Sequence, residues 1–310
     1  MKIELSIIIV NYRSWDKLKF CLKSILTQKQ INLKVIVVDN FSNDNKLDLF
    51  KENFKWVEWI ISNENLGFAK ACNLGATFAN SKWILFLNPD TLLVENSLSS
   101  LVKYCDNNTQ HKIIGIKQLN SKNKPSNSFG LFLDLWTSNG FFRIFSRIFK
   151  GQTYKKINSC SISNPDWISG SFILLRKNDF QKLNGWNESY WMYFEDMDLC
   201  KRAKNLNLKV SLLNNWKCIH FHGESSRKNK EILIKTKTEV IKSSHIYVNT
   251  HISYFKSIII HFLMIFFKSI ELIILTPFSS TKREIFKQCI IFWKKSILSG
   301  VWIEKRSINY

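Results

Sequence analysis

Residues 82–91 read KWILFLNPDT, in which the five apolar residues of Trp83–Leu87 run directly into Asn-Pro-Asp. Two similar runs precede it in the chain, Leu5–Val10 and Val35–Val38, and both are rich in β-branched residues. All three runs are nearly continuous and lack alternation, which is typical of parallel strands covered on both faces. They predict three buried strands of a parallel sheet.

Helical patterns separate these predicted strands. Residues 15–27 repeat apolar side chains at helical spacing, and a second helix is expected over about 68–79. The order strand, helix, strand, helix, strand predicts an α/β fold with a mostly parallel central sheet. In such sheets ligands bind at the carboxyl ends of the strands. Each predicted strand ends in polar residues: Asn11-Tyr12, Asp39-Asn40 and Asn88-Pro89-Asp90.

The chain has 310 residues, of which 45% are hydrophobic, enough for one large domain with an appendage. Its seven cysteines are scattered without a CxxC motif, which is typical of reduced core thiols in a cytosolic protein. The first apolar run is short, follows Glu4 and lacks a small-residue cleavage site. We therefore expect it to be a strand and not a signal peptide.

The formal net charge is +21, and residues 226–310 carry 15 Lys/Arg against 5 Asp/Glu, which is +10 of that total. Such an excess favours anionic partners: an anionic membrane surface, a phosphorylated substrate or nucleic acid. A basic nucleic-acid-binding protein is one alternative, although no recognition module is visible and the basic residues lie in apolar segments.

The last part of the chain, from about residue 227, predicts long, basic and apolar helices. The uncharged run between Lys256 and Lys268 has eleven residues, whereas a spanning helix needs roughly 20. One narrow, mostly polar stripe recurs there at helical spacing: Ser257, His261, Met264, Lys268 and Glu271. We expect an amphipathic helix, either at a membrane interface or packed against the domain, and not a membrane span.

The polar strand ends carry the first candidate site residues. The motifs GxGxxG, GxxxxGK[ST], HExxH and GxSxG are all absent. A carboxylate at Asp39 can accept from a base N–H or a ribose hydroxyl, or it can simply close an Asx-turn. Asn65, Gly67 and Lys70 open the next predicted helix, whose free N–H groups can receive a phosphate, unless Asn65 only caps the helix.

Acidic residues and histidines supply the second set. Asp90 alone is a poor metal site, but a Mg²⁺ or Mn²⁺ that bridges a diphosphate needs only one or two protein oxygens. His220 can complete that shell or be structural. Glu195 and Asp196 open a predicted helix, where Asp196 is either a general base or part of an acidic first turn. Asp198 and Arg202 can pair at i, i+4, a structural role.

Taken in order, these residues resemble glycosyltransferase family 2, particularly its rhamnosyltransferase-like members. The matching segments lie between about residues 5 and 226: SIIIVNY, VVDNFSND, NLGFAKACNLG, LFLNPDT, DWISGSFILLRK, LNGWNESYWMYFEDMDLCKR and IHFHGESS. The resemblance implies a GT-A fold and inverting transfer from a nucleotide-diphosphate sugar. It implies a domain over 1–226, with a nucleotide-binding half at about 1–100 and an acceptor half at about 101–226, followed by basic helices over 227–310.

The resemblance also implies roles for single residues. Asp39 matches the residue that reads the nucleotide base, and Asp196 matches the catalytic base. Asn88-Pro89-Asp90 stands where the family has its Asp-x-Asp metal motif, so Asp90 is expected to hold Mg²⁺ or Mn²⁺. His220, and not His222, has Gly223 and Ser225 at the offsets of the family's H-x-x-G-x-S ending, which makes it a second metal ligand.

The remaining predicted site residues fall on the two sides of the reaction. The residues expected to bind the nucleotide sugar are Asn11, Tyr12, Asp39, Asn65, Gly67, Lys70, Asn73 and Asn88. Those expected on the acceptor side are Trp167, Gly170 and Glu195. The chain departs from the family at Asn184–Glu188, where relatives read G-G-F-D-E, and at Asn88, which replaces the first Asp of the metal motif.

The resemblance leads to an inverting, metal-dependent sugar transferase. The expected donor is dTDP-rhamnose or a UDP-sugar, and the expected acceptor is a hydroxyl of a lipid-linked or cell-surface glycan. The basic helices would keep the enzyme peripherally attached to the cytoplasmic face of the cell membrane. A nucleotidyltransferase with a related sheet is the second alternative, beside the nucleic-acid-binding protein.

Overall fold

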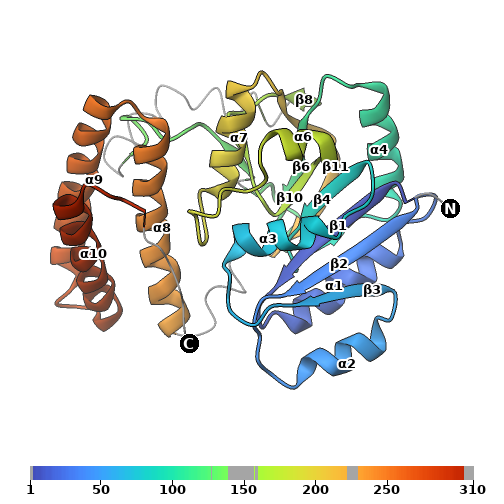
Figure 1. Cartoon of the computed structure of the whole chain (residues 1–310), viewed down its shortest axis with the longest axis horizontal. Helices are drawn as coiled ribbons and strands as arrows, with labels where there is room; N and C mark the ends of the chain where they lie inside the picture. Colours follow the sequence, from blue (N-terminus) through green and yellow to red (C-terminus); the bar gives the residue numbers. More distant parts are fainter. Residues whose placement is uncertain (1–2, 127, 139–156, 158–159, 222–229, 304–310) are drawn as a thin grey trace.

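The protein is described here from a computed structural model that covers residues 3–126, 128–138, 157, 160–221 and 230–303. A large mixed sheet with helices on both faces forms the greater part of the molecule, and three long C-terminal helices stand beside it (Figure 1). The α/β fold with a central sheet and C-terminal helices, predicted from the sequence, is confirmed.

Among the described residues the central sheet has nine strands, in the order β3-β2-β1-β4-β10-β6-β11-β5, with β8 beside β11. β7 (Phe129–Gly130) and β9 (Trp167–Ile168) form a separate two-stranded sheet. The strands of the central sheet are β1 (Leu5–Asn11), β2 (Leu33–Asp39), β3 (Val57–Ile61), β4 (Trp83–Leu87), β5 (Thr91–Leu93), β6 (Ile113–Leu119), β8 (Ile162–Ser163), β10 (Phe172–Arg176) and β11 (Val210–His220).

The first half of the sheet is parallel, and it contains the three strands that the apolar runs predict. β1 pairs with β2 on one side and β4 on the other, all parallel, and β3 extends the sheet beyond β2. The second half is mixed: β10 runs antiparallel to β4 and β6, whereas β11 is parallel to β6 and antiparallel to β5. The change of direction at β10 brings later parts of the chain back to the carboxyl ends of β1, β2 and β4.

Helices cover the two faces of the sheet and bury two apolar clusters. On one face, residues of α1 and α4 pack against β1 and β4; on the other, residues of α3, α6 and α7 do so. The helices around the sheet are α1 (Trp15–Leu26), α2 (Lys46–Asn53), α3 (Phe68–Thr77), α4 (Ser97–Asn107), α6 (Lys177–Lys182) and α7 (Glu195–Asn205). All seven cysteines are free, as expected for a protein with reduced thiols.

The C-terminal helices are α8 (Lys230–His251), α9 (Tyr254–Leu275) and α10 (Ser280–Ser299). They pack on one another through a cluster that includes Leu272, Cys289 and Phe292. A second cluster, with Tyr190 and Tyr247 fully buried, joins α8 and α9 to the sheet domain. The predicted boundary near residue 226 falls within residues 222–229, outside the described part of the chain.

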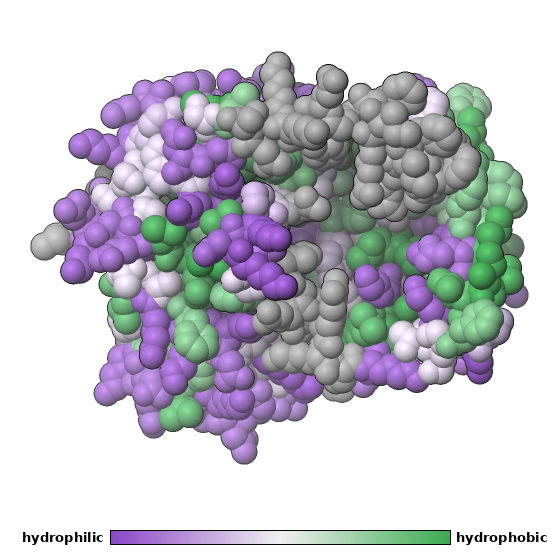
Figure 2. Space-filling view, turned by 180° about the vertical axis from the view of Figure 1, so that it is seen from behind, coloured by the Kyte–Doolittle hydropathy of each residue, from purple (hydrophilic) through white to green (hydrophobic). Residues whose placement is uncertain are grey.

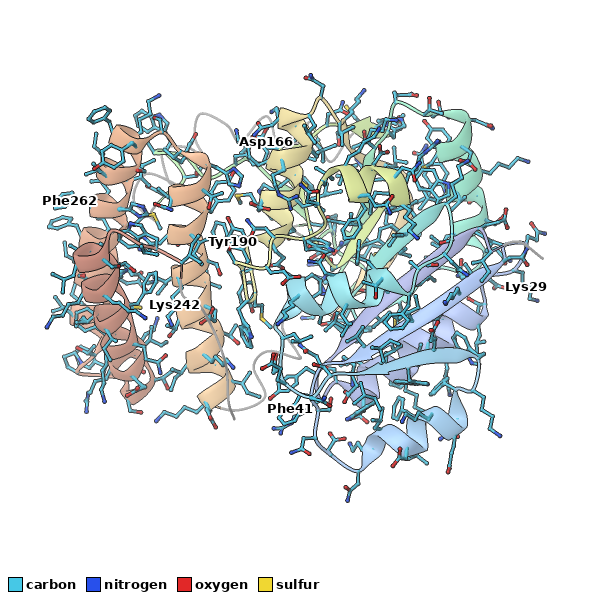
Figure 3. The ribbon with its side chains drawn as sticks, viewed as in Figure 1. Lys29, Phe41, Asp166, Tyr190, Lys242 and Phe262 are labelled. Atoms are coloured by element: carbon cyan, nitrogen blue, oxygen red, sulfur yellow. The ribbon has the colours of Figure 1, made fainter. Side chains whose placement is uncertain are left out.

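The first part of the polar stripe of α9 faces the protein, whereas Glu271 at its end is exposed. The apolar side of the helix faces outward. Ser257 and His261 are buried, and His261 Nδ1 lies 2.8 Å from His245 Nδ1 of α8. On the opposite side Phe255 is 80% exposed and Phe262 is 64% exposed. Figure 3 shows Phe262 pointing away from the molecule, and Figure 2 shows hydrophobic side chains gathered over the C-terminal helices. The arrangement reverses the polarity that a helix on a water-soluble surface normally has.

Among the described residues, α9 is the one helix long and apolar enough to cross a membrane by length and composition. Core helices of soluble proteins pass the same test, but only 22% of the most apolar window of α9 is buried. That α9 lies at a membrane interface stays a prediction.

Candidate functional site

The carboxyl ends of β1 and β2 bring Asn11 and Asp39 side by side, because these residues are register partners in the parallel pairing. Asn11 Nδ2 donates to Asp39 Oδ1 at 3.3 Å, and the Ser42 hydroxyl donates to the same oxygen. Both site residues are buried, and burial raises the pKa of the Asp39 carboxyl above its ordinary value.

The Asp39 side chain holds the turn after β2, which supports the turn-closing role that the sequence offered as an alternative to ligand binding. The backbone N–H of Ser42, three residues on, donates to Asp39 Oδ2 at 3.3 Å, so the side chain closes the turn, although an Asx-turn would use the N–H two residues on. Ser42 Oγ also accepts from the backbone N–H of Arg13 at 2.9 Å. Tyr12, half-buried, lies beside the Arg13 guanidinium, which is 5.4 Å from its ring centroid. The turn and a ligand-reading role are compatible, since a carboxylate has more than two acceptor sites.

The segment before α3 is closed by side-chain amides. Asn65 Oδ1 accepts from the backbone N–H of Gly67 at 3.1 Å and from Asn40 Nδ2 at the same distance. Gly67, and not Asn65, is the N-cap residue of α3, so the capping alternative for Asn65 is wrong. The backbone N–H of Phe68 donates to the carbonyl of Trp191 at 2.7 Å. The first amide of the helix is therefore used by a later segment of the chain.

Lys70 and Asn73, both on α3, differ in what they contact. Lys70 is exposed and lies 3.7 Å from Glu64 Oε1. Asn73 Nδ2 donates to the Trp186 carbonyl and to Glu188 Oε1, each at 2.9 Å, and its Oδ1 accepts from Trp186 N–H. Asn73 thus holds residues 186–188 against α3.

The second group of site residues meets where β5 pairs with β11. Thr91 of β5 is the register partner of His220, so the preceding residue, Asp90, reaches the histidine across the pair. Asp90 Oδ1 lies 3.2 Å from His220 Nε2, and both side chains are nearly buried. Asn88, half-buried, precedes them in the turn, where its carbonyl accepts from Thr91 N–H at 3.1 Å. His222 lies outside the described residues.

The Asp90–His220 pair suits a divalent metal ion. Two neighbouring ligands of an octahedral Mg²⁺ or Mn²⁺ are about 3 Å apart, close to the separation of these two atoms. Gln118 Oε1 lies 3.0 Å from His220 Nδ1, so a histidine that donates from Nδ1 turns the lone pair of Nε2 toward the carboxylate. Among the described residues no group of three His, Cys, Asp or Glu side chains converges. Solvent and substrate oxygens can supply further ligands of an ion here.

Asp196 lies in the first turn of α7, which begins at Glu195 as the sequence predicts. Its Oδ2 accepts from the backbone N–H of Gly170 at 3.1 Å, and its Oδ1 accepts from that of Met197 at 2.8 Å. Burial raises the pKa of the Asp196 carboxyl, although these two hydrogen bonds act in the opposite direction.

Glu195 is buried, and its Oε2 has no hydrogen-bond partner among the described residues. Burial, reinforced by the neighbouring Asp196, raises its pKa well above the ordinary value of a glutamate. Burial therefore disfavours the charged form of Glu195 beside Asp196.

One hydrogen-bonded line connects Asp196 to the Asp90–His220 pair. Gly170, which donates to Asp196, is followed by Ser171, whose hydroxyl lies 2.7 Å from Gln118 Nε2. Gln118 in turn contacts His220, so the line crosses β10, β6 and β11 in the order in which they lie in the sheet. The sequence reasoning missed Gln118 and Ser171. Their signals in the sequence were the amide of Gln118 near the end of a mostly apolar strand and the second serine of the segment SGS.

Trp167 lies in β9, and its indole N–H donates to the carbonyl of Leu131 at 3.0 Å. The ring covers Gly130, where an added Cβ would come within 2.7 Å of Trp167 Nε1. The predicted acceptor-side residues Trp167 and Gly170 thus lie in one short segment, residues 167–170, which contacts Asp196 through the N–H of Gly170.

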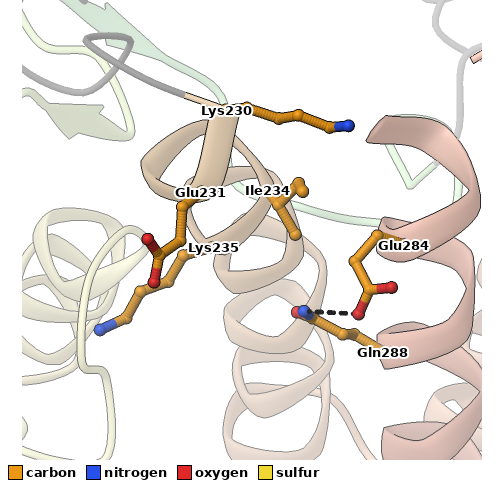
Figure 4. A pocket seen from close by; sticks show the side chains of 6 residues that line it. All are labelled: Lys230, Glu231, Ile234, Lys235, Glu284 and Gln288. Carbon is orange, nitrogen blue, oxygen red and sulfur yellow. Dashed lines mark hydrogen bonds between the residues drawn. The ribbon is translucent and has the colours of Figure 1, made fainter. Parts of the chain in front are cut away.

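A separate cavity of about 480 Å³ lies between the start of α8 and α10 (Figure 4). None of its lining residues is a predicted site residue, and its two lysines are balanced by two glutamates. The lining residues are Lys230, Glu231, Ile234, Lys235, Glu284 and Gln288. The balance of charge gives this cavity no preference for an anionic ligand.

Comparison with known proteins gives a consistent set of relatives. The sequence model of glycosyl transferase family 2 matches residues 6–180, more than half of the chain. A second model, described as the N-terminal domain of galactosyltransferase, matches residues 152–224. Rhamnosyltransferase WbbL of Escherichia coli (strain K12) is 25% identical over 228 residues, which cover 71% of this chain and 84% of WbbL.

Two further proteins bear on donor and acceptor. N-acetylglucosaminyl-diphospho-decaprenol L-rhamnosyltransferase of Mycobacterium tuberculosis (strain CDC 1551 / Oshkosh) is 22% identical over 221 residues, covering 64% of this chain and 69% of the relative. The crystal structure of GalNAc-T7 with UDP, GalNAc and Mn²⁺ superposes with a TM-score of 0.58 at 13% identity. That superposition covers 80% of this chain but 48% of the other, so this chain spans about half of its length. At such identity the likeness shows the fold alone.

The close approach of Gly67 to the Trp191 segment yields a stability prediction. Gly67 has φ +77° and ψ −179°, a conformation open essentially to glycine alone, and an added Cβ would meet the Trp191 carbonyl oxygen at 2.4 Å. We expect Gly67→Ala to lower the free energy of unfolding by about 2–3 kcal/mol or more, since steric overlap adds to backbone strain. Urea unfolding followed by circular dichroism measures this loss.

The matched control is Gly300→Ala. Gly300 also has a positive φ, +67°, but an added Cβ there would meet nothing within 4 Å. Its substitution should cost only the backbone term, about 1 kcal/mol. Equal losses for the two variants would contradict the role assigned to the contact between Gly67 and Trp191.

Proposed function

This chain belongs to glycosyltransferase family 2, and we propose that it catalyses inverting transfer of a sugar from a nucleoside-diphosphate sugar to a hydroxyl group of a glycan. Family membership makes it a glycosyltransferase, and its neighbours in structure have the GT-A fold. The nucleotidyltransferase and nucleic-acid-binding alternatives are not favoured, because the matching models and relatives are glycosyltransferases.

The observation that carries the proposal is the line of contacts from Asp196 through Ser171 and Gln118 to His220 and Asp90. A base and a pair of metal-binding side chains belong to one continuous site at the carboxyl edge of the sheet. This arrangement suits a displacement in which a hydroxyl loses its proton on one side of the sugar while a diphosphate leaves on the other.

In the proposed reaction Asp196 accepts the proton of the acceptor hydroxyl. The hydroxyl oxygen forms a bond to the anomeric carbon from the face opposite the diphosphate. The bond between that carbon and the diphosphate oxygen breaks, and the nucleoside diphosphate leaves with the electron pair. A raised pKa suits a general base that works near neutral pH. A single displacement inverts the anomeric centre and needs no second charged carboxylate.

Asp90 and His220 are the residues proposed to hold Mg²⁺ or Mn²⁺. The ion, when bound, would offset the negative charge that develops on the departing diphosphate. Gln118 orients His220 by its contact with Nδ1. The presence of Mn²⁺ in the structure of GalNAc-T7, which shares the fold, supports a divalent ion.

The nucleotide is proposed to bind at the ends of β1 and β2. Asp39 and Asn11 offer a carboxylate and an amide beside each other, and Tyr12 stands next to them with a ring on which a base can stack. Asn65, Gly67, Lys70, Asn73 and Asn88 remain predicted donor-side residues. UDP in the structure of GalNAc-T7 supports a nucleoside diphosphate, whereas the relation to rhamnosyltransferases makes dTDP-rhamnose an equal candidate.

The acceptor is proposed to be a lipid-linked or cell-surface glycan that approaches along Trp167, Gly170 and Glu195. The mycobacterial relative is named for a diphospho-decaprenol acceptor, and this supports the lipid-linked class. The outward apolar side of α9 would then lie in the interface of the membrane that contains the acceptor. We place the enzyme on the cytoplasmic face of the cell membrane, attached peripherally, with the basic residues of the C-terminal helices toward anionic lipid.

Replacing the proposed base tests the mechanism. Asp196→Asn keeps the shape of the side chain but cannot accept the proton, so kcat should fall by about 100- to 10,000-fold while affinity for the nucleotide changes little. Nucleoside diphosphate release from a panel of nucleotide sugars, with Mn²⁺ and a membrane extract as acceptor source, measures turnover. Calorimetric titration with UDP and dTDP measures binding.

The matched control is Asp48→Asn, an exposed aspartate on α2 that should retain full activity. Near-normal turnover of Asp196→Asn would remove this residue as the base. Absence of turnover by the wild type with every donor, in the presence of acceptor extract, would refute the transferase proposal.

Removing the contact behind His220 tests the metal proposal. Gln118→Leu abolishes the hydrogen bond to His220 Nδ1, and Mn²⁺ affinity in the presence of UDP should fall by about 10- to 100-fold. Gln28→Leu is the matched control: Gln28 is also buried and bonded, with Nε2 2.8 Å from the Val94 carbonyl, but it lies outside the site. Calorimetric Mn²⁺ titration decides the matter. Equal affinities in the two variants would show that Gln118 does not support a metal site.

Membrane attachment is tested on the outward side of α9. Each exposed phenylalanine that enters lipid contributes about 1.5–3 kcal/mol, so the double variant Phe255→Ser and Phe262→Ser should bind vesicles at least about 10-fold more weakly. Phe20→Ser, an exposed phenylalanine on α1, is the control. Sedimentation with vesicles of phosphatidylcholine, with and without phosphatidylglycerol, measures binding. Equal binding of both variants, or none by the wild type to either vesicle, would contradict the proposal.

A further inference from the structure

The C-terminal helix α8 contacts the segment that leads into α7, over residues 190–198. Ser243 Oγ donates to the Met192 carbonyl at 2.8 Å, and the Tyr247 ring lies 5.9 Å from that of Phe194. His251 Nε2 lies 2.7 Å from Asp198 Oδ1. Positions 243, 247 and 251 are four residues apart, so these three side chains share one face of α8.

A fourth contact lies two turns earlier on the same helix. Lys235 Nζ stands 4.0 Å from the centroid of the Trp191 ring, a cation–π arrangement. Figure 3 shows Tyr190, which begins the segment, between the sheet domain and α8. Contacts of α8 thus follow the segment from Trp191 to Asp198.

The contacted segment has a backbone that needs external support. Tyr193 and Phe194 have φ +70° and +67°, and such left-handed conformations are unfavourable for aromatic residues. They reverse the chain immediately before Glu195, so they decide where Asp196 lies. Conformations of this kind persist where surrounding contacts hold them. α8 supplies contacts on both sides of the reversal, to Met192 before it and to Asp198 after it.

Asp198 is the firmest of these anchors. It is fully buried, and its carboxylate accepts from Arg202 Nε at 2.7 Å, which confirms the predicted i, i+4 pair. Asn187 Nδ2 contributes a longer hydrogen bond of 3.3 Å to Oδ1. Burial acts to raise the pKa of Asp198, but the bonds from His251 and Arg202 outweigh it and hold the pKa below the usual value. Without His251, Oδ1 of this buried charge would keep only the longer bond.

We propose that α8 belongs to the catalytic machinery, with His251 and Ser243 as positioning residues that hold the 190–198 segment and thereby place Asp196. The inference rests on the proposed function of Asp196, but not on the identity of donor or acceptor. It assigns the C-terminal region a role in turnover that is separate from membrane attachment.

The test compares four variants of the full chain. His251→Leu removes the donor to Asp198, and Ser243→Ala removes the donor to Met192. His251→Gln keeps an amide N–H that can reach Asp198 and should restore activity. His111→Leu is the matched control, because His111 is also a histidine with little exposed side chain, and its Nδ1 lies 2.7 Å from the hydroxyl of Ser211 at the start of β11. Turnover is measured well below the melting temperature of every variant.

We expect His251→Leu to lower kcat by about 10- to 100-fold with the donor KM within about twofold, since misplacement of a catalytic group affects turnover more than binding. Ser243→Ala should show a smaller loss of the same kind, and His251→Gln should recover most of it. His111→Leu should keep the wild-type kcat. A kcat loss in His251→Leu no larger than in His111→Leu, or a KM rise that accounts for the whole effect, would overturn the inference.

A second measurement does not depend on activity. Hydrogen–deuterium exchange of peptides that cover residues 190–198 should become faster in His251→Leu and stay unchanged in His111→Leu. Unchanged exchange in His251→Leu refutes the positioning role even if the transferase proposal holds. Faster exchange in a protein that turns over no nucleotide sugar supports the positioning role of α8. It refutes the proposed function of the site instead.

Discussion

The antiparallel pairing of β5 with β11 is the constraint on which the rest of the site depends. It joins β5, which directly follows the Asn-Pro-Asp turn, to β11, the last strand in chain order. The pairing places Asp90 Oδ1 3.2 Å from His220 Nε2. The pairing also keeps the two side chains buried at the edge of a sheet whose central strands bury mostly apolar side chains. A polar pair in such a place is stable only when its hydrogen-bonding capacity is met, and Gln118 contributes to that requirement from the neighbouring strand.

From this pair, contacts spread to the side of the sheet where the chain reverses direction. Gln118 reaches Ser171, and Gly170 beside it donates to Asp196. A change in any one of these residues alters the position of the next, because each side chain is fixed by its neighbour across a strand. The base and the pair at β5 and β11 are therefore one structural unit, although they come from segments far apart in the chain.

The C-terminal helices add a second level of organisation. Their inner surface is polar where α8 meets the 190–198 segment, and their outer surface on α9 is apolar. A region that only attached the protein to a bilayer would not need the contact of His251 with Asp198, and a region that only supported the sheet domain would not need outward-facing phenylalanines. The two surfaces of one helical layer suit a protein whose chemistry takes place next to the membrane that holds its acceptor.

Much of the fold follows from the sequence by itself. The continuous apolar runs Leu5–Val10, Val35–Val38 and Trp83–Leu87 are buried parallel strands as predicted, since only a strand covered on both faces can lack polar alternation. The start of α7 at Glu195 and the pair of Asp198 with Arg202 also follow from local patterns, because helix ends and i, i+4 contacts depend on residues near in sequence. The motifs of the family pointed to Asp90, Asp196 and His220.

Only the tertiary structure decided what these residues contact. Three contacts join residues that no local pattern connects. They are the pairing of β5 with β11, the contact of Gln118 with His220, and the contact of His251 with Asp198. Strand order in a mixed sheet depends on the packing of the whole chain, and the sequence of one strand does not identify the strand with which it pairs. The stripe on α9 shows the same limit: its spacing predicts a polar face, but only the packed helices show that Ser257, His261 and Met264 of this face are buried. Periodicity determines which side chains share a face, whereas burial of the whole molecule determines which face meets the protein.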